Sequence, residues 1–246
     1  MADPNTLAEN RPSMLARLMA GIAEHAPHVT AGPVDDTPNP DEPGHPEYHR
    51  RQRAEFALSR WKTAAPRRYQ DATTTHPDVM AWADQAAVDV RDAGFLVLTG
   101  GVGTGKTHQA YGALRRIAEA GPKRFEMVAT TAPDMYGRLR PGGSEGGTEY
   151  ELRRLCRVPL LLLDDLGTEK LSEWTEEATY RLVNERYNEC LPLIITTNLP
   201  VRTSGGPSAD LVTRLGDRLA SRLAQTATVV QFDGTDLRRT FRGPAA

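Results

Sequence analysis

The chain has 246 residues and a nearly balanced charge, with 30 Lys and Arg against 32 Asp and Glu. This balance excludes a strongly basic protein that binds nucleic acid over its whole surface, so any such binding must be local. No apolar run approaches the roughly 20 residues that span a bilayer, and MADPNTLAEN lacks the regions of a secretory signal. With only Cys156 and Cys190 present, the sequence predicts a cytoplasmic protein without membrane association.

Residues 1–30 are predicted to form a tail with one short amphipathic helix. Its apolar side chains fall on a single helical stripe, made by Met14, Leu15, Leu18, Met19 and Ile22. Such a stripe can dock into the groove of a partner protein or fold back onto its own domain. We treat it as a partner-docking helix. Residues 31–49 follow as a Pro-rich, acidic linker with almost no large apolar residue to bury.

Residues 50–68 are a basic helical segment with seven Lys and Arg against Glu55. A solvated helix face is the usual explanation of such a run, and contact with phosphate groups is the alternative. The remaining residues, 69–246, alternate between helical and strand patterns. Helices are predicted over 77–93, 106–121, 132–140, 149–157, 172–189 and 209–225, and strands over 94–100, 124–130, 159–165, 191–198 and 227–232.

Strands that alternate with crossover helices predict a parallel sheet with helices on both faces. The fold class is therefore α/β, a three-layer sandwich around a five-stranded parallel sheet. In such folds the ligand lies beyond the carboxyl ends of the strands. Those strand ends are where the sequence places its polar motifs.

The turn after the first strand matches the phosphate-loop pattern G-x-x-x-x-G-K-[ST], with a strand before it and a helix after it. Its glycines allow backbone N–H groups to surround phosphate oxygens, and the helix N-terminus adds partial positive charge. Lys106 would neutralise the β and γ phosphates, and the Thr107 hydroxyl would ligate magnesium. The predicted nucleotide-binding residues are Gly100, Gly101, Val102, Gly103, Thr104, Gly105, Lys106, Thr107 and His108.

Two adjacent carboxylates end the apolar strand LLLLDD. Asp164 would hold Mg²⁺ through water, and Asp165 would polarise an attacking water. A glutamate would reach further than Asp165, so slow hydrolysis is expected. Asn198, at the end of the next strand, would contact the γ-phosphate or orient that water, with a plain turn residue as the alternative. Further along, Arg214, Arg218 and Arg222 share one helix face, either as a solvated stripe or to reach a neighbouring subunit's ATP.

In this order, GGVGTGKT, LLLLDDLG, IITTN and GDRLASRL resemble the AAA+ ATPases, a class of P-loop NTPases, over about residues 66–242. More narrowly they resemble the DnaC/DnaI-type replicative helicase loaders, with the IstB transposition helpers close by. The resemblance implies Walker A at Lys106 and Thr107, Walker B at Asp164 and Asp165, and sensor I at Asn198. It further implies an arginine finger acting in trans, namely Arg222 with Arg218 as the second candidate, and sensor II at Arg238, with no room for a full helical lid.

The resemblance also implies ATP and Mg²⁺ as cofactors and self-association into an ATP-dependent helical oligomer. Single-stranded DNA would run along its inner face and contact Arg140, Ser172 and Trp174. An arginine and a tryptophan suit phosphate contact and base stacking, although Trp174 could equally pack in the core at a helix start. The acidic linker and the lack of a cysteine-rich N-terminal zinc module depart from the loader pattern.

Two functions follow from the resemblance. In the first, the chain loads a hexameric DnaB-type replicative helicase onto single-stranded DNA, with the N-terminal helix docking on the helicase. In the second, it is an IstB-like helper of transposition that binds duplex DNA and recruits a transposase. Fold resemblance alone does not separate the two functions.

Overall fold

The computed structural model describes residues 14–25, 39–167, 172–201, 210–234 and 236–237. The chain divides into two compact units, Met1–Asn39 and Pro40–Ala246. The first unit contains α1 (Met14–His25), so the predicted N-terminal helix is present. Met14, Leu18 and Met19 on this helix are exposed, whereas the side chains of Leu15 and Ile22 lie outside the described residues. The docking role of α1 stays a prediction.

The second unit is built on a five-stranded sheet in the order β2-β3-β4-β1-β5, and every neighbouring pair is parallel. The strands are β1 (Phe95–Gly100), β2 (Met127–Thr131), β3 (Leu160–Asp164), β4 (Leu193–Thr197) and β5 (Ala227–Phe232). This sheet confirms the predicted fold class. Because β3 and β4 lie side by side and β4 lies next to β1, the carboxyl ends of these three strands meet at one edge.

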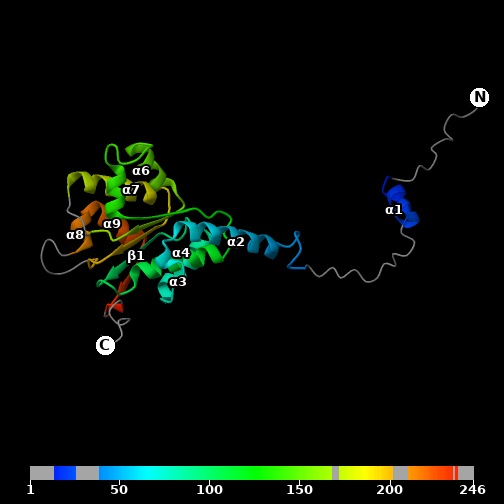
Figure 1. Cartoon of the computed structure of the whole chain (residues 1–246), viewed down its shortest axis with the longest axis horizontal. Coiled ribbons are helices and arrows are strands. Elements are labelled where there is room, and N and C mark those ends of the chain that lie inside the picture. Colours follow the sequence, from blue (N-terminus) through cyan, green and yellow to red (C-terminus); the bar gives the residue numbers. More distant parts are fainter. Residues whose placement is uncertain (1–13, 26–38, 168–171, 202–209, 235, 238–246) are drawn as a thin grey trace, which may run out of the picture. The chain divides into compact units, whose positions relative to one another are not determined.

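Helices cover both faces of the sheet (Figure 1). One face carries α2 (Pro46–Ala64), α3 (Pro77–Val88) and α4 (Lys106–Glu119). The other carries α5 (Ala132–Leu139), α6 (Thr148–Arg157), α7 (Glu173–Asn188), α8 (Leu211–Leu215) and α9 (Asp217–Thr226). None of the helices in the described part of the chain combines the length and apolar character that a membrane span requires.

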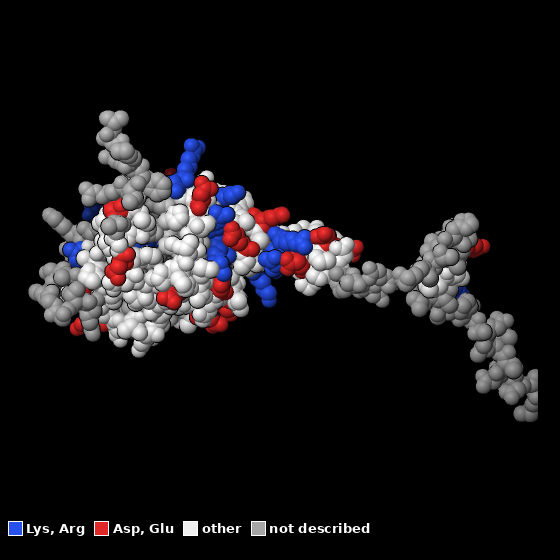
Figure 2. Space-filling model, turned by 90° about the horizontal axis from the view of Figure 1, so that it is seen from below, with Lys and Arg blue, Asp and Glu red and all other residues white. Residues whose placement is uncertain are grey.

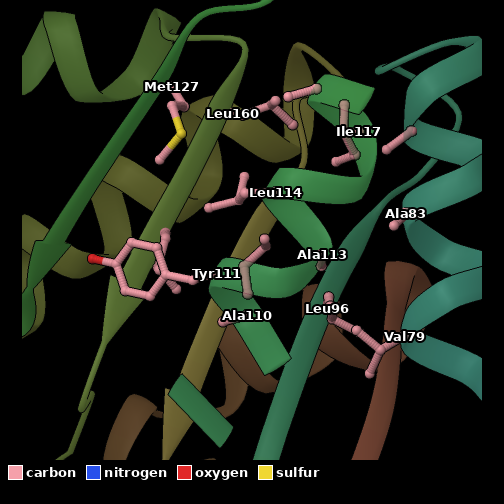
Figure 3. Close-up of a cluster of buried hydrophobic side chains, with 14 of the residues drawn as sticks. Val79, Ala83, Leu96, Ala110, Tyr111, Ala113, Leu114, Ile117, Met127 and Leu160 are labelled. Carbon is pink, nitrogen blue, oxygen red and sulfur yellow. The ribbon is translucent and has the colours of Figure 1, made fainter. Parts of the chain in front are cut away.

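The two faces of the sheet bury alternate residues of the same strands. On β1, Leu96 and Leu98 pack under α4, whereas Phe95 and Val97 belong to the opposite core. This period of two is the geometry of a β-strand, and burial on both faces explains the nearly continuous apolar runs in the sequence. In Figure 3, Leu114 and Ile117 of α4 point towards the sheet. The core therefore fixes α4, and with it the turn that precedes α4.

α2 differs from the boundaries predicted for residues 31–68. It begins at Pro46, inside the range assigned to the linker, with His45 as its N-cap. Ala57 and Trp61 are buried, and Trp61 Nε1 donates a hydrogen bond to the Tyr111 carbonyl at 3.2 Å. The predicted boundaries at 49/50 and 68/69 thus fall within one compact unit, because Ala57 and Trp61 of α2 are buried in the same core as α4.

The helix predicted over 209–225 is two helices. Gly216 lies between α8 and α9 with φ 77° and ψ 159°, a conformation that is almost restricted to glycine. Gly216 therefore ends one helix and redirects the next, and the arginines on either side of it do not continue one straight stripe. On the face of the second unit shown in Figure 2, basic and acidic side chains lie close together, as the balanced composition predicts.

Candidate nucleotide-binding site

The phosphate-loop turn connects the end of β1 to the start of α4. Gly103 and Gly105 have φ of 80° and 94°, in the left-handed region that favours glycine. The Thr104 hydroxyl donates to the Gly101 carbonyl at 2.9 Å and closes the loop on itself. The turn therefore presents its backbone N–H groups at the N-terminus of α4, as phosphate binding requires.

Lys106 connects this loop to the end of β4. Its side chain is buried, and Nζ donates to the carbonyls of Gly100 and Gly101 at 2.8 and 2.6 Å. The same ammonium donates to Asn198 Oδ1 at 2.9 Å. Two residues that are 92 positions apart in the sequence are thus in direct contact, as the parallel topology predicts.

Asp164 lies at the end of β3 and faces α4. Its Oδ1 accepts hydrogen bonds from the Thr107 hydroxyl at 2.9 Å and from the Thr196 hydroxyl at 2.5 Å. Burial raises the pKa of Asp164, and the two hydroxyl donors and Lys106 oppose that shift. The side chain is therefore a desolvated carboxylate held in one orientation by two strands and a helix.

Asp165 has a left-handed backbone with φ 64°, which is uncommon outside glycine. Its N–H donates to Thr196 Oγ1 at 2.9 Å, and its Oδ1 accepts from the Asn198 amide at 3.0 Å. Lys106, Asn198 and Asp165 thus form a continuous hydrogen-bonded chain. Thr196, which contacts both aspartates, was not predicted, because nothing in the local pattern of β4 distinguishes it from an ordinary strand residue.

These groups line a cavity of about 630 Å³, within the usual range for a small-molecule site. Its walls include residues that sequence reasoning missed, namely Arg68, Tyr69, Gln109, Thr196 and Leu237. Tyr69 stacks on Tyr111 with ring centroids 4.7 Å apart and an interplanar angle of 10°. Gln109 Oε1 accepts hydrogen bonds from Thr74 Oγ1 and Thr75 N–H and so fixes the loop before α3. The predicted residue His108 also lines the cavity, and its Nε2 accepts from Thr73 N–H at 3.3 Å.

Arg214, Arg218 and Arg222 are not among the described residues that line this cavity. The Arg222 guanidinium lies over the rings of Tyr180 and Tyr187, 5.3 and 5.5 Å from their centroids, and Nη1 donates to the Arg218 carbonyl at 2.9 Å. Arg218 is exposed on the same helix. Arg214, on α8, donates to the Gly167 carbonyl just after β3. Arg238, the predicted sensor II residue, lies outside the described residues.

The predicted DNA contacts lie together where α5 ends and α7 begins. The Arg140 guanidinium lies 6.0 Å from the centroid of the Trp174 ring, which also meets Tyr136 edge to face. Arg140 is exposed and Trp174 is half-buried, so the tryptophan both packs on the core and presents an edge to solvent. Ser172 is the N-cap of α7, where it forms a capping box with Thr175.

A phosphate loop between β1 and α4, a buried lysine and paired aspartates at the end of β3, which β4 separates from β1, define a P-loop nucleotide-binding protein. The chain belongs to the family of IstB-like ATP binding proteins, whose family model matches residues 48–244. This match and the solved structures described next confirm the resemblance to DnaC/DnaI-type AAA+ ATPases that the sequence predicts.

The similar proteins come from two biological settings. An ATP-binding protein of an insertion sequence of Mycobacterium tuberculosis is 28% identical over 157 residues, covering 63% of this chain and 60% of that protein. The replicative helicase loader DnaI of Bacillus subtilis is 26% identical over 104 residues, covering 42% of this chain and 32% of the relative. The chain thus spans less than two thirds of the length of these curated relatives.

Among solved structures, the crystal structure of the DnaC helicase loader matches with a TM-score of 0.58 and 28% identity, covering 68% of this chain and 100% of the solved chain. The DnaI structure, at a TM-score of 0.55 and 18% identity, supports the fold alone.

Proposed function

We propose that this chain is an ATPase that uses ATP binding to grip single-stranded DNA and to load a DnaB-type replicative helicase. ATP binding is the property of its family; hydrolysis, DNA binding and the helicase partner belong to the proposal. The observation that carries the ATPase assignment is the hydrogen-bonded chain from Lys106 through Asn198 to Asp165. It joins a phosphate-binding cation to a carboxylate beside the position where a water can attack.

Each residue has a distinct role in hydrolysis. Lys106 exchanges its contacts with the Gly100 and Gly101 carbonyls for the β and γ phosphates. Asn198 orients the attacking water, and Asp165 accepts a hydrogen bond from that water. The water oxygen bonds to the γ phosphorus as the bridging oxygen leaves with ADP, and the water proton passes to the released phosphate. Because an aspartate is short for this task, turnover is slow.

The Thr107 hydroxyl and the Asp164 carboxylate fit a magnesium site. They lie 2.9 Å apart and offer only oxygen atoms, the donor type that Mg²⁺ prefers, and few protein ligands are expected because Mg²⁺ keeps several waters. When bound, the ion would neutralise charge on the β and γ phosphates. Thr196 holds Asp164 in place for this role through the 2.5 Å hydrogen bond.

A trans arginine completes the site in a self-assembled oligomer. Arg218 is exposed on α9 and can reach a neighbouring subunit, whereas the Arg222 guanidinium lies over the rings of Tyr180 and Tyr187. The geometry therefore favours Arg218 over Arg222, the reverse of the order that the resemblance implies. Arg222 then supports the position of α9 against α7.

The DNA-binding assignment is carried by the contact between Arg140 and Trp174. A cation above an aromatic ring offers a phosphate contact next to a stacking surface, and this combination suits single-stranded DNA of any sequence. Arg140 is the C-cap of α5 and Trp174 lies in the first turn of α7, so tertiary folding brings the two side chains together. The 28% identity to the DnaC helicase loader over the full solved chain supports the choice of a helicase as the partner.

The second candidate is an ATPase that assists transposition by gripping duplex DNA and recruiting a transposase. It is favoured by the family match and by insertion-sequence relatives such as that of Mycobacterium tuberculosis. Both candidates use the same ATP site and differ in the DNA that they hold and the protein that they recruit.

The two candidates are separated by the DNA that binds in each nucleotide state. Labelled single-stranded and duplex DNA would be titrated with ATP, ADP and no nucleotide, for wild type, Lys106→Ala, Arg222→Ala, Arg218→Ala and Trp174→Ala. A preference for single strands that requires ATP and falls at least about tenfold in Lys106→Ala and Trp174→Ala supports the loader. ATP-dependent preference for duplex DNA supports the transposition helper. No DNA binding in any state would contradict both candidates.

A further inference from the structure

The segment that follows β5 returns to the phosphate loop. β5 pairs with β1, and Phe232 lies opposite Gly100 at the start of the loop. Beyond it, Leu237 N–H donates a hydrogen bond to the Gly103 carbonyl at 3.0 Å, and the Leu237 side chain lines the nucleotide cavity. The end of the described chain is therefore attached directly to the loop that surrounds the phosphates.

This attachment places the Asp236 carboxylate against Gly103. A Cβ atom added to Gly103 would lie 1.8 Å from Asp236 Oδ1 and 2.2 Å from its Cγ, so the carboxylate occupies the space that a side chain at Gly103 would need. Gly103 also has φ of 80°, and both features require glycine at this position. A negative charge thus touches a loop whose Lys106 and backbone N–H groups attract negative charge.

We propose that Asp236 sets the charge selectivity of the nucleotide site, opposing free nucleoside polyphosphates and favouring their magnesium complexes. This inference rests on the proposed ATP site and adds a residue to it. The repulsion between the carboxylate and a phosphate chain at the same loop grows with the charge of the ligand. Bound Mg²⁺ lowers that charge, so Asp236 weakens Mg-free ATP more than it weakens MgATP.

The test compares nucleotide affinities in the presence of Mg²⁺ and of a chelator. Isothermal titration with ATP would be performed on the full chain for wild type, Asp236→Asn and Asp236→Ser. Asp233→Asn is the matched control, because it removes the same charge from the same segment. Asp233 Oδ1 accepts a hydrogen bond from Gln231 Nε2 at 2.8 Å, whereas the Asp236 carboxylate lies against Gly103 of the phosphate loop.

Both Asp236 variants are expected to bind Mg-free ATP about five- to tenfold more tightly than wild type and MgATP about twofold more tightly. The ratio of the two affinities therefore falls, while Asp233→Asn keeps the wild-type ratio. Equal changes with and without Mg²⁺ would indicate a structural effect and overturn the inference, as would unchanged or weaker Mg-free binding. If wild type bound no nucleotide at all, the proposed function would fail and this inference with it.

Discussion

Single residues at the edge of the sheet combine burial with charge. Asp164 is a carboxylate with raised pKa, Lys106 is a buried ammonium, and Asp165 has a left-handed backbone. Each feature is unfavourable for folding alone. Their hydrogen bonds to Thr196, Asn198 and the loop carbonyls offset part of that cost, and the phosphates and magnesium of the ligand would offset more. The site is therefore expected to be more stable when occupied.

Asp164→Asn is expected to stabilise the empty protein while removing activity. Burial raises the pKa of Asp164, so the folded protein binds this proton more tightly than the unfolded chain does. Wild-type stability accordingly falls as pH rises from the ordinary aspartate pKa of about 3.9 through the raised value. An asparagine can keep both hydroxyl contacts through Oδ1 without this penalty.

The check is thermal unfolding of both proteins across the acid-to-neutral range, together with ATP hydrolysis. At neutral pH the variant should melt higher, and the difference should vanish below about pH 4. Hydrolysis should fall by about 100-fold or more. A variant that melts lower than wild type at neutral pH would show that the charge of Asp164 stabilises the empty fold.

The motif residues of the site follow from the sequence because their spacing and their position at strand ends are local features. Lys106, Asp164 and Asn198 needed only the rule that parallel strands end at one edge. Thr196 and Tyr69 reach the site through tertiary packing, and Asp236 reaches the phosphate loop in the same way. No local pattern marks these three residues, so they could not be predicted. Arg68 belongs to the basic segment 50–68, for which phosphate contact was one of two alternatives, but nothing in that run distinguishes it from the other basic residues.

At the scale of elements, α7 is fixed to the sheet by a fully buried arginine. Arg186 donates hydrogen bonds to backbone carbonyls at the end of α6 and before β3 and β4, namely those of Leu155, Cys156, Val158, Pro159 and Pro192. Burial lowers the pKa of Arg186 to about 9, still above neutral pH, so the guanidinium keeps its charge. One side chain thus satisfies carbonyls from three segments.

Arg186→Lys is expected to destabilise the fold by about 2 to 4 kcal/mol, because an ammonium has fewer donors and lacks the planar guanidinium geometry. Arg181→Lys is the control on the same helix. Arg181 pairs at the surface with Glu149 at 3.0 Å, so this variant should change stability by less than about 0.5 kcal/mol. Urea unfolding measures both changes. Equal stabilities for the two variants would show that the hydrogen bonds of Arg186 to the backbone carbonyls do not fix α7 to the sheet.

Gly216→Ala is expected to cost about 2 kcal/mol, because φ 77° with ψ 159° strains any residue with a Cβ. The cost is backbone strain alone, since a Cβ added there meets no atom within 4 Å among the described residues. Gly137→Ala, inside α5, is the opposite case, with open space for a Cβ, and should stabilise by about 0.5 to 1 kcal/mol. Thermal melts of both variants would test the assignment, and a neutral Gly216→Ala would contradict it.

Apolar periodicity in the sequence predicts where helices and strands lie better than it predicts where a helix is interrupted. Apolar periodicity predicted every strand of the sheet and its flanking helices, because burial on the sheet creates that periodicity. It did not predict the break at Gly216, since a glycine within a periodic pattern is compatible with either a continuous helix or a turn. The sequence pattern also gave no reason to include α2 in the ATPase domain, because α2 is polar around most of its circumference and buries little beyond Ala57 and Trp61.

For the molecule as a whole, the proposed function requires an arginine of one subunit to complete the nucleotide site of another. Arg218→Ala should leave ATP affinity unchanged within about twofold. At protein concentrations at which the subunits assemble, it should lower the rate of ATP hydrolysis by about 100-fold or more. Arg222→Ala should instead lower thermal stability, because Arg222 stacks on Tyr180 and Tyr187. Steady-state hydrolysis and melting of the two variants test this assignment. Full activity in Arg218→Ala would return the finger role to Arg222.

The proposed function requires the nucleotide site and the Arg140–Trp174 surface to be coupled, and such coupling is reciprocal. If ATP tightens DNA binding by some factor, DNA must tighten ATP binding by the same factor. We would therefore measure the affinity for a non-hydrolysable ATP analogue with and without single-stranded DNA. We expect the wild type to bind the analogue about 5- to 100-fold more tightly with DNA, and Trp174→Ala to bind it equally with and without DNA. Equal affinities with and without DNA in the wild type would contradict the coupling.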